Sequence, residues 1–272
     1  MRITLILSKN PFLRVSPIIF FLLIILMGQG IAQHAPELTV WQKFLKKYVD
    51  TSAADGINRV RYVSVSKPDS ASIHAFLHSM QGTAVSTLTK DEQRAFWINV
   101  YNAQTVAVVL DHYPLKSIRH IKLAGSTSSG PWDSKLLKIE GKELTLNDIE
   151  NNILRAQWKD KRIHFALNCA SIGCPNLGVQ VFTAANSEKL LESGARAFLK
   201  SRRGFDLDTN RAILNLSSIF DWYKTDFGST EKERLNSLIP FLPVEKTELL
   251  KKFSGKIIYG YDWNLNDAAP AH

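Results

Sequence analysis

Cysteine is scarce in this chain, which has only two in 272 residues, and several common catalytic motifs are missing altogether. There is no glycine-rich phosphate-binding loop, no HExxH zinc helix and no GxSxG nucleophile elbow, which excludes the enzyme classes built on them. Two cysteines separated by four residues supply only half of the ligands of a four-coordinate zinc site. We therefore expect no metal and no cofactor.

Long apolar segments are also lacking, apart from one run at positions 18–27. A transmembrane helix needs about 20 apolar residues, so this run is too short to cross a bilayer. Basic residues precede the run and small residues follow it, which is the pattern of a cleaved secretory signal. We expect residues 1–32 to be removed and the mature protein to be periplasmic or secreted, with no stable membrane span. The alternative is an uncleaved N-terminal anchor.

Acidic residues are outnumbered, with 25 Asp and Glu against 34 Lys and Arg and a net charge of +9. Arg2, Lys9 and Arg14 leave with the signal, so the mature chain carries +6. No basic run is interleaved with aromatic residues, and we expect no nucleic-acid partner. The charge favours contact with anionic polymers of the cell envelope, and the alternative is an ordinary solvated basic surface.

No low-complexity linker or internal repeat divides the chain, and 45% of its residues are hydrophobic. We predict one domain over residues 33–266 and a frayed tail at 267–272. Short helices and strands alternate irregularly, which predicts an α+β fold with helices packed on a small mixed or antiparallel sheet. The main expected elements are a capped, buried helix over 89–114, hairpins turning near 141 and 209, a strand at 162–167 and a final strand at 255–266.

Both cysteines lie in one segment, RIHFALNCASIGCPNL, at residues 162–177. If Cys169 is a nucleophile and His164 its base, the chain must turn back directly after the strand, because an extended chain would hold the two about 16 Å apart. Asn168 is a turn-forming residue and permits this. In an oxidising compartment the alternative is a Cys169–Cys174 disulfide.

Three further polar positions allow both a structural and a functional interpretation. Asn99 and Asn102 share one side of an apolar helix, and a buried unpaired amide costs about 1–3 kcal/mol, so we expect both to be buried and paired. They either bond neighbouring backbone or, with Asn168, line a ligand-binding pocket. Asp262 either accepts hydrogen bonds from loop amides or orients His164, as an acid does in catalytic triads.

Four segments occur in an order that is similar to one known family. They are AFWINVYNAQT at 95–105, RIHFALNCASIGCPNL at 162–177, LSSIFDWYKTDFG at 216–228 and YDWNLND at 261–267. Together they resemble the domain of unknown function 547 family over roughly residues 80–267. The resemblance implies a domain found in exported bacterial proteins and in plant proteins, where it is often joined to a coiled coil. It implies no particular activity.

The residues themselves therefore support two hypotheses. The first is an exported cysteine-dependent hydrolase or acyl transferase of the cell envelope, with Cys169 as nucleophile, His164 as base and Asp262 as orienting acid. The second is a non-catalytic envelope module for ligand binding or assembly, with a closed disulfide and an unknown small-molecule or peptide ligand. Segment 216–228 is interpreted as core packing, not chemistry.

Overall fold

The structure is a computed structural model that describes residues 37–124 and 129–268. The predicted signal segment, residues 1–32, lies outside the described residues. From Leu38 onward the described chain forms one unit. None of the described helices is long and apolar enough to cross a membrane.

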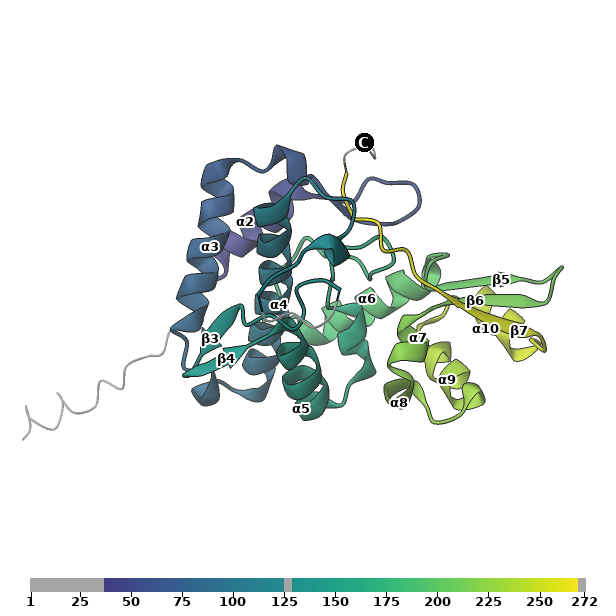
Figure 1. Cartoon of the computed structure of the whole chain (residues 1–272). Helices are drawn as coiled ribbons and strands as arrows, with labels where there is room; N and C mark the ends of the chain where they lie inside the picture. The colour runs from purple at the N-terminus through teal and green to yellow at the C-terminus, as the bar shows by residue number, and fades with distance from the viewer. Residues whose placement is uncertain (1–36, 125–128, 269–272) are drawn as a thin grey trace, which may run out of the picture. The chain divides into compact units, whose positions relative to one another are not determined.

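The central helix α4 (Lys90–His112) is buried along most of its length (Figure 1). Its start is fixed by a capping box, in which the Thr89 hydroxyl accepts from the Glu92 amide and the Glu92 carboxylate accepts from the Thr89 amide. Pro114 lies shortly beyond the last turn, where proline disfavours further helix. The predicted buried, capped helix is confirmed.

The other helices are mostly short. α2 packs on α3, and α3, the π-helical segment η4 and α6 each pack on α4. The α-helices are α2 (Thr39–Tyr48), α3 (Lys67–Gln81), α5 (Ala156–Trp158), α6 (Ser187–Lys200), α7 (Ile219–Trp222), α8 (Lys224–Phe227), α9 (Glu231–Leu238) and α10 (Val244–Lys251). The remaining helical segments are η1 (Tyr62–Ser64), η2 (Val85–Thr87), η3 (Ile118–His120), η4 (Asp148–Arg155), η5 (Lys161–Phe165) and η6 (Ile239–Phe241).

The described strands form three small sheets, which confirms the α+β class. β1 (Val49–Asp50) pairs with β2 (Arg59–Val60), and β3 (Leu137–Ile139) forms a hairpin with β4 (Lys142–Leu144). The largest sheet is mixed, because β6 (Ile213–Ser217) is antiparallel to β5 (Phe205–Asp208) and parallel to β7 (Lys256–Gly260). Both predicted hairpins are therefore present, and the final strand joins the second one.

The apolar side chains gather in two clusters. The larger surrounds α4 and includes residues of α2 and α3, such as Trp41 and Phe76. The smaller packs α6 against the mixed sheet, with Phe198, Phe205 and Phe220 among its members. Phe165 of η5 belongs to the smaller cluster, so the segment that carries His164 is anchored there.

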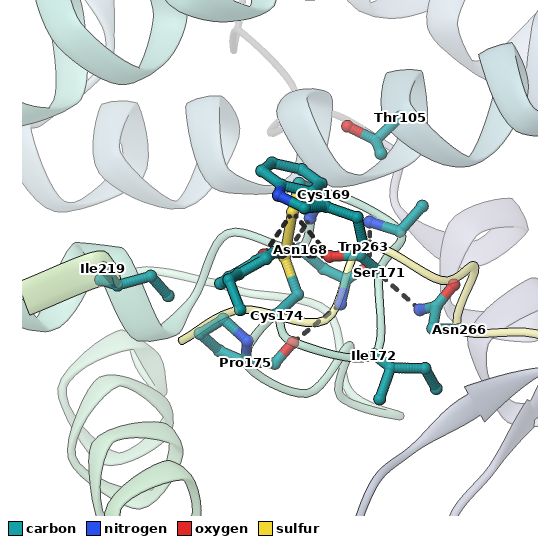
Figure 2. Close-up of a disulfide and its surroundings, with 12 residues drawn as sticks. Thr105, Asn168, Cys169, Ser171, Ile172, Cys174, Pro175, Ile219, Trp263 and Asn266 are labelled. Atoms are coloured by element: carbon teal, nitrogen blue, oxygen red, sulfur yellow. Dashed lines mark hydrogen bonds between the residues drawn. A yellow bond between two sulfur atoms is a disulfide. The ribbon is translucent and has the colours of Figure 1, made fainter. Parts of the chain in front are cut away.

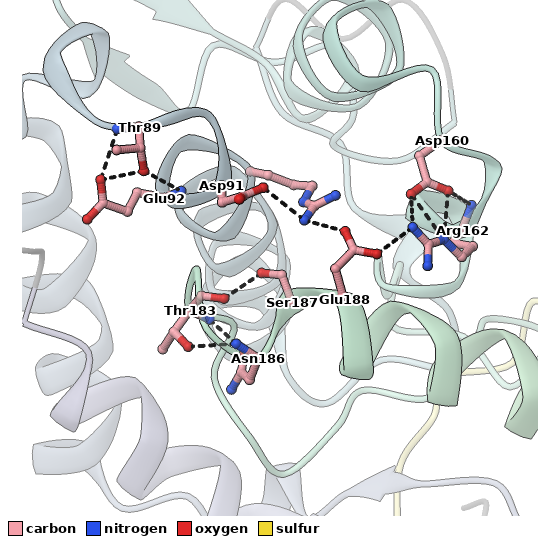
Figure 3. Close-up of polar contacts among 10 residues, drawn as sticks. Thr89, Asp91, Glu92, Asp160, Arg162, Thr183, Asn186, Ser187 and Glu188 are labelled. Carbon is pink, nitrogen blue, oxygen red and sulfur yellow. Dashed lines mark hydrogen bonds and ion pairs between the residues drawn. The ribbon is translucent and has the colours of Figure 1, made fainter.

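A chain of ion pairs joins the start of α4 to α6 and to the residues before η5 (Figure 3). Arg94, whose side chain is 6% exposed, pairs with Asp91 and with Glu188 of α6 at 2.6 Å. Glu188 also pairs with Arg162 at 2.8 Å, and Arg162 pairs with Asp160. These contacts fix η5, and with it His164, relative to the central helix.

One local expectation is wrong. Residues 162–167 do not form a strand, because η5 winds Lys161–Phe165 into a 3₁₀ helix whose start Asp160 caps by accepting from the Arg162 amide. Of the predicted tail, Asp267 accepts a hydrogen bond from Tyr113 and Ala268 donates its amide to Val60, while residues 269–272 lie outside the described residues.

Candidate functional site

The two cysteines form a disulfide, Cys169–Cys174, which closes a small loop directly after η5 (Figure 2). The loop is held by Asn168, whose side chain donates to the Pro175 carbonyl at 2.7 Å and accepts from the Ala170 amide at 3.0 Å. Cys169 is half-buried and Cys174 is buried. The structure therefore contains the Cys169–Cys174 disulfide, which was the alternative to a Cys169 nucleophile.

The C-terminal segment after β7 packs against this loop. Gly173 donates its amide to the Asp262 carbonyl at 2.8 Å, and a Cβ added at Gly173 would lie 2.8 Å from the Asp262 nitrogen. Only glycine allows so close an approach. Tyr261 then reaches the disulfide, with its hydroxyl 2.9 Å from Cys169 Sγ and 3.1 Å from Cys174 Sγ.

His164 is buried between two carboxylates. Its Nε2 lies 2.7 Å from Asp226 Oδ2, and its Nδ1 lies 3.7 Å from Glu150 Oε1. The other Glu150 oxygen accepts a hydrogen bond from the hydroxyl of Tyr101, on α4, at 3.2 Å. The ring of Tyr223 covers the imidazole, with ring centroids 4.1 Å apart. We call these five residues the His164 cluster.

Charges within the His164 cluster stabilise one another. Burial opposes a charged imidazole, but the Asp226 hydrogen bond and the Glu150 carboxylate outweigh it and raise the pKa of His164 above its ordinary value. Burial likewise opposes ionisation of Glu150 and Asp226, yet His164 lowers the pKa of both carboxyls. Arg155 adds a bidentate pair to Asp226, at 2.6 and 2.8 Å. The carboxylates of Glu150 and Asp226 thus face one guanidinium and one imidazole whose protonation they favour.

A cavity of about 200 Å³ lies between the His164 cluster and the disulfide. Its aromatic lining is Tyr101, Trp132, Trp222, Tyr223, Tyr261 and Trp263, and its polar lining includes Asn147, Glu150 and His164. Cys169 and Cys174 form part of the wall, and Trp263 is drawn with them in Figure 2. Trp222 is 49% exposed, so the aromatic side of the cavity opens to solvent.

The proposed catalytic residues are only partly brought together. His164 and Cys169 line the same cavity, but both imidazole nitrogens face carboxylates, and Cys169 Sγ contacts Tyr261 and its disulfide partner. Asp262 is not the acid beside His164. It is exposed, accepts from the Asn264 amide at 2.9 Å and so fixes the turn after β7, whereas Asp226 occupies the position expected for it.

The predicted binding asparagines are buried and paired with backbone groups. Asn99 exchanges two hydrogen bonds with the backbone of Phe182, at 2.7 and 3.0 Å. Asn102 donates to the Ala166 carbonyl and accepts from the Asn168 amide, both at 2.8 Å. None of these three asparagines lines the described cavity. The predicted burial and pairing of Asn99 and Asn102 are confirmed. Their partners are backbone groups, as the structural interpretation of these residues expected.

Segment 216–228 is wrongly interpreted as packing alone, because Trp222, Tyr223 and Asp226 reach the cavity or the His164 cluster. Glu150, in η4, is missed as well. The sequence offers little signal for Glu150 or Asp226, because each acid lies among other polar residues. Sequence spacing alone does not show that these acids converge on a histidine from a third segment.

Residues 85–199 match the model of one protein family, described as "Protein of unknown function, DUF547". This match confirms the predicted resemblance to the family over that segment. The matched residues include α4, η4, η5 and the disulfide loop, and thus Tyr101, Glu150 and His164 of the cluster. Segments 216–228 and 261–267 lie beyond them. No curated protein and no solved structure matches the chain.

Proposed function

We propose that the protein is an exported, non-catalytic module that binds a sugar ring of an envelope glycan in the cavity beside His164. The observation that carries this proposal is the composition of the cavity wall, in which partly exposed aromatic rings face a small set of buried polar groups. Ligand sites have this combination of apolar walls and a few placed polar groups.

The aromatic side of the cavity suits a flat ligand with an apolar face. Trp222 and Trp263 are stacked, with centroids 5.7 Å apart, and Tyr261 lies 4.5 Å from Trp263. The C–H face of a sugar ring packs on such indole rings and removes apolar surface from water. The volume of about 200 Å³ is below the usual range for drug-sized ligands, which favours a single ring.

The polar side suits a neutral ligand rich in hydroxyl groups. Glu150, the acid that lines the cavity, faces His164 at 3.7 Å, so its carboxylate is paired within the protein and does not stand alone as a cation site. The fixed carboxylate of Glu150 can accept hydrogen bonds from ligand hydroxyls. Asn147 adds an amide to the same wall.

Two contacts weigh against cysteine catalysis. The nucleophile is the thiolate, and in a disulfide neither cysteine supplies one. A base must also present a free nitrogen to its nucleophile, while Nε2 of His164 is bonded to Asp226 and Nδ1 faces Glu150.

A closed disulfide also supports export, because such bonds persist in oxidising compartments.

The test is a fluorescence titration of the mature protein with short neutral oligosaccharides, namely maltooligosaccharides and chitooligosaccharides. We expect saturable quenching, weakened at least about tenfold by Trp222→Ala, because aromatic anchors dominate such contacts. Trp158→Ala is the matched control, since Trp158 is a partly exposed tryptophan that packs under Lys90 outside the cavity.

The proposal is contradicted if neither series binds, or if both tryptophan variants bind equally well. It is replaced by the cysteine enzyme if reduced protein turns over an acyl substrate and Cys169→Ala abolishes that turnover.

A further inference from the structure

A second, larger cleft adjoins the cavity and differs from it in charge. Its volume is about 910 Å³, and its basic lining consists of Lys116, Arg119, His120, Arg202 and Arg203. Among the described residues, Asp262 is the only acid that lines it. The cleft therefore has the electrostatic character of a site for anionic groups.

The basic residues lie on different segments and hold different positions. Lys116, Arg119 and His120 lie in and next to η3, and Arg202 and Arg203 lie between α6 and β5. Lys116, Arg119 and Arg202 are exposed, and Arg202 is paired with Asp206 at 3.1 Å. The acid, Asp262, is bonded to the Asn264 amide within its own turn. Positive charge thus borders the cleft on two sides.

Arg203 is the inner basic residue. Its terminal nitrogens donate to the Ile172 carbonyl and to the Asn176 side chain, while its Nε is buried without a partner. Burial lowers the pKa of Arg203 to about 10, which leaves the guanidinium charged at neutral pH. No ion pair joins Arg203 to a carboxylate among the described residues, so its charge adds to the positive potential of the cleft.

Tyr261 and Trp263 line both the cleft and the cavity. Arg119 stacks over Trp263, with the guanidinium carbon 5.1 Å from the ring centroid. One ligand can therefore place a sugar ring on the aromatic wall and an anionic group beside Arg119. An open cleft of this size suits a chain of several units better than one small ion.

We propose that this cleft binds the anionic groups of a linear, charged polysaccharide, whose neighbouring ring enters the aromatic cavity. The sugar half of this inference rests on the proposed function, and the anionic half rests on the cleft alone.

The experiment compares three probes by calorimetric titration of the mature protein: oligogalacturonate, a maltooligosaccharide of equal length, and polyphosphate. We expect oligogalacturonate to bind most tightly and to weaken as salt is added, because salt screens exposed charges. The triple variant Lys116→Gln/Arg119→Gln/Arg202→Gln should weaken it about tenfold. The control triple Lys43→Gln/Lys46→Gln/Lys232→Gln removes the same charge from exposed positions outside the cleft and should change binding less than about twofold.

Each half of the proposal has its own contradicting result. Equal loss in both triple variants, or equal affinity for the neutral and the charged oligosaccharide, overturns the cleft as an anion site and leaves the proposed function standing. Polyphosphate binding as tightly as oligogalacturonate overturns the choice of a polysaccharide. Cleft-dependent binding that Trp222→Ala leaves unchanged overturns the sugar cavity but not the anion site.

Discussion

Two groups of buried polar side chains lie against helix α4, and they differ in where their partners come from. Asn99 and Asn102 project from α4 and bond backbone groups of neighbouring segments. In the His164 cluster, by contrast, Tyr101 of α4 bonds Glu150, and the side chains of Glu150 and Asp226 face one imidazole.

The kind of partner distinguishes polar residues that hold the fold together from polar residues that can form a binding site. Asn99 and Asn102 spend their side-chain hydrogen bonds on backbone groups, and neither lines the cavity, so both act in the fold. The His164 cluster instead borders the cavity, where its polar atoms can meet a bound molecule. The two groups therefore differ in the origin of their partners and in whether they border the cavity.

The largest expected effect is that of Glu150→Leu. The variant removes the carboxylate that faces Nδ1 of the buried His164. Removing one partner of a buried charge pair costs about 3–5 kcal/mol of unfolding free energy. Urea denaturation measures the change. Glu143→Leu is the control, because Glu143 is exposed and its loss should cost less than about 0.5 kcal/mol. Equal effects of the two variants would mean that the His164 cluster does not stabilise the fold.

A smaller loss is expected for Asn102→Leu. The variant removes the partner of the Ala166 carbonyl and of the Asn168 amide, and we expect it to lower the unfolding free energy by about 1–3 kcal/mol. Sugar affinity of the folded fraction should be unchanged, since Asn102 lies outside the cavity lining. Normal stability combined with lost binding would place Asn102 in the site and reverse the distinction drawn between the two groups.

Loss of the disulfide should lower the unfolding free energy by about 2 kcal/mol. The effect is modest because a short closed loop restricts the unfolded chain less than a long one. The change is measured as the shift in urea midpoint between wild type and Cys169→Ser/Cys174→Ser. Mass spectrometry of the natively exported protein, alkylated without reduction, should show no labelled cysteine. A fully labelled, equally stable native protein would restore the nucleophile hypothesis.

The smallest effect is a dependence on pH. The native pKa of His164 is raised above its unfolded value of about 6.5, so the stability that it contributes is complete below that pH and is lost as pH rises through the native pKa. The difference in unfolding free energy between wild type and His164→Gln should therefore be greater at pH 6 than at pH 9. A difference that grows with pH would contradict the charged imidazole.

Local patterns predicted much of the fold. The capping box and apolar run of α4, the glycine turn between β3 and β4 and the burial of Asn99 follow from short-range chemistry. The 3₁₀ helix at 161–165 was missed because alternating apolar residues also suit a strand, and here the Asp160 cap and the packing of Phe165 decide the conformation.

Less of the candidate site than of the fold could be predicted from the sequence. His164 and Cys169 were found because they share one short segment. Asp226 was missed because segment 216–228 was interpreted as packing, and Asp262 was proposed as the orienting acid although neither acid lies near His164 in sequence. Convergence of this kind depends on the packing of α8 against η5, which no local pattern encodes.

The most direct test of the account uses the indole N–H signals of the six tryptophans in an NMR titration with the oligosaccharide that binds best. Trp132, Trp222 and Trp263 line the cavity, while Trp41, Trp97 and Trp158 do not, so each protein sample contains its own control. Single Trp→Phe variants assign the signals. The account predicts that the three cavity signals shift in a saturable way and that the other three stay in place. Saturable shifts confined to Trp41, Trp97 or Trp158, or no shift at all, would contradict it.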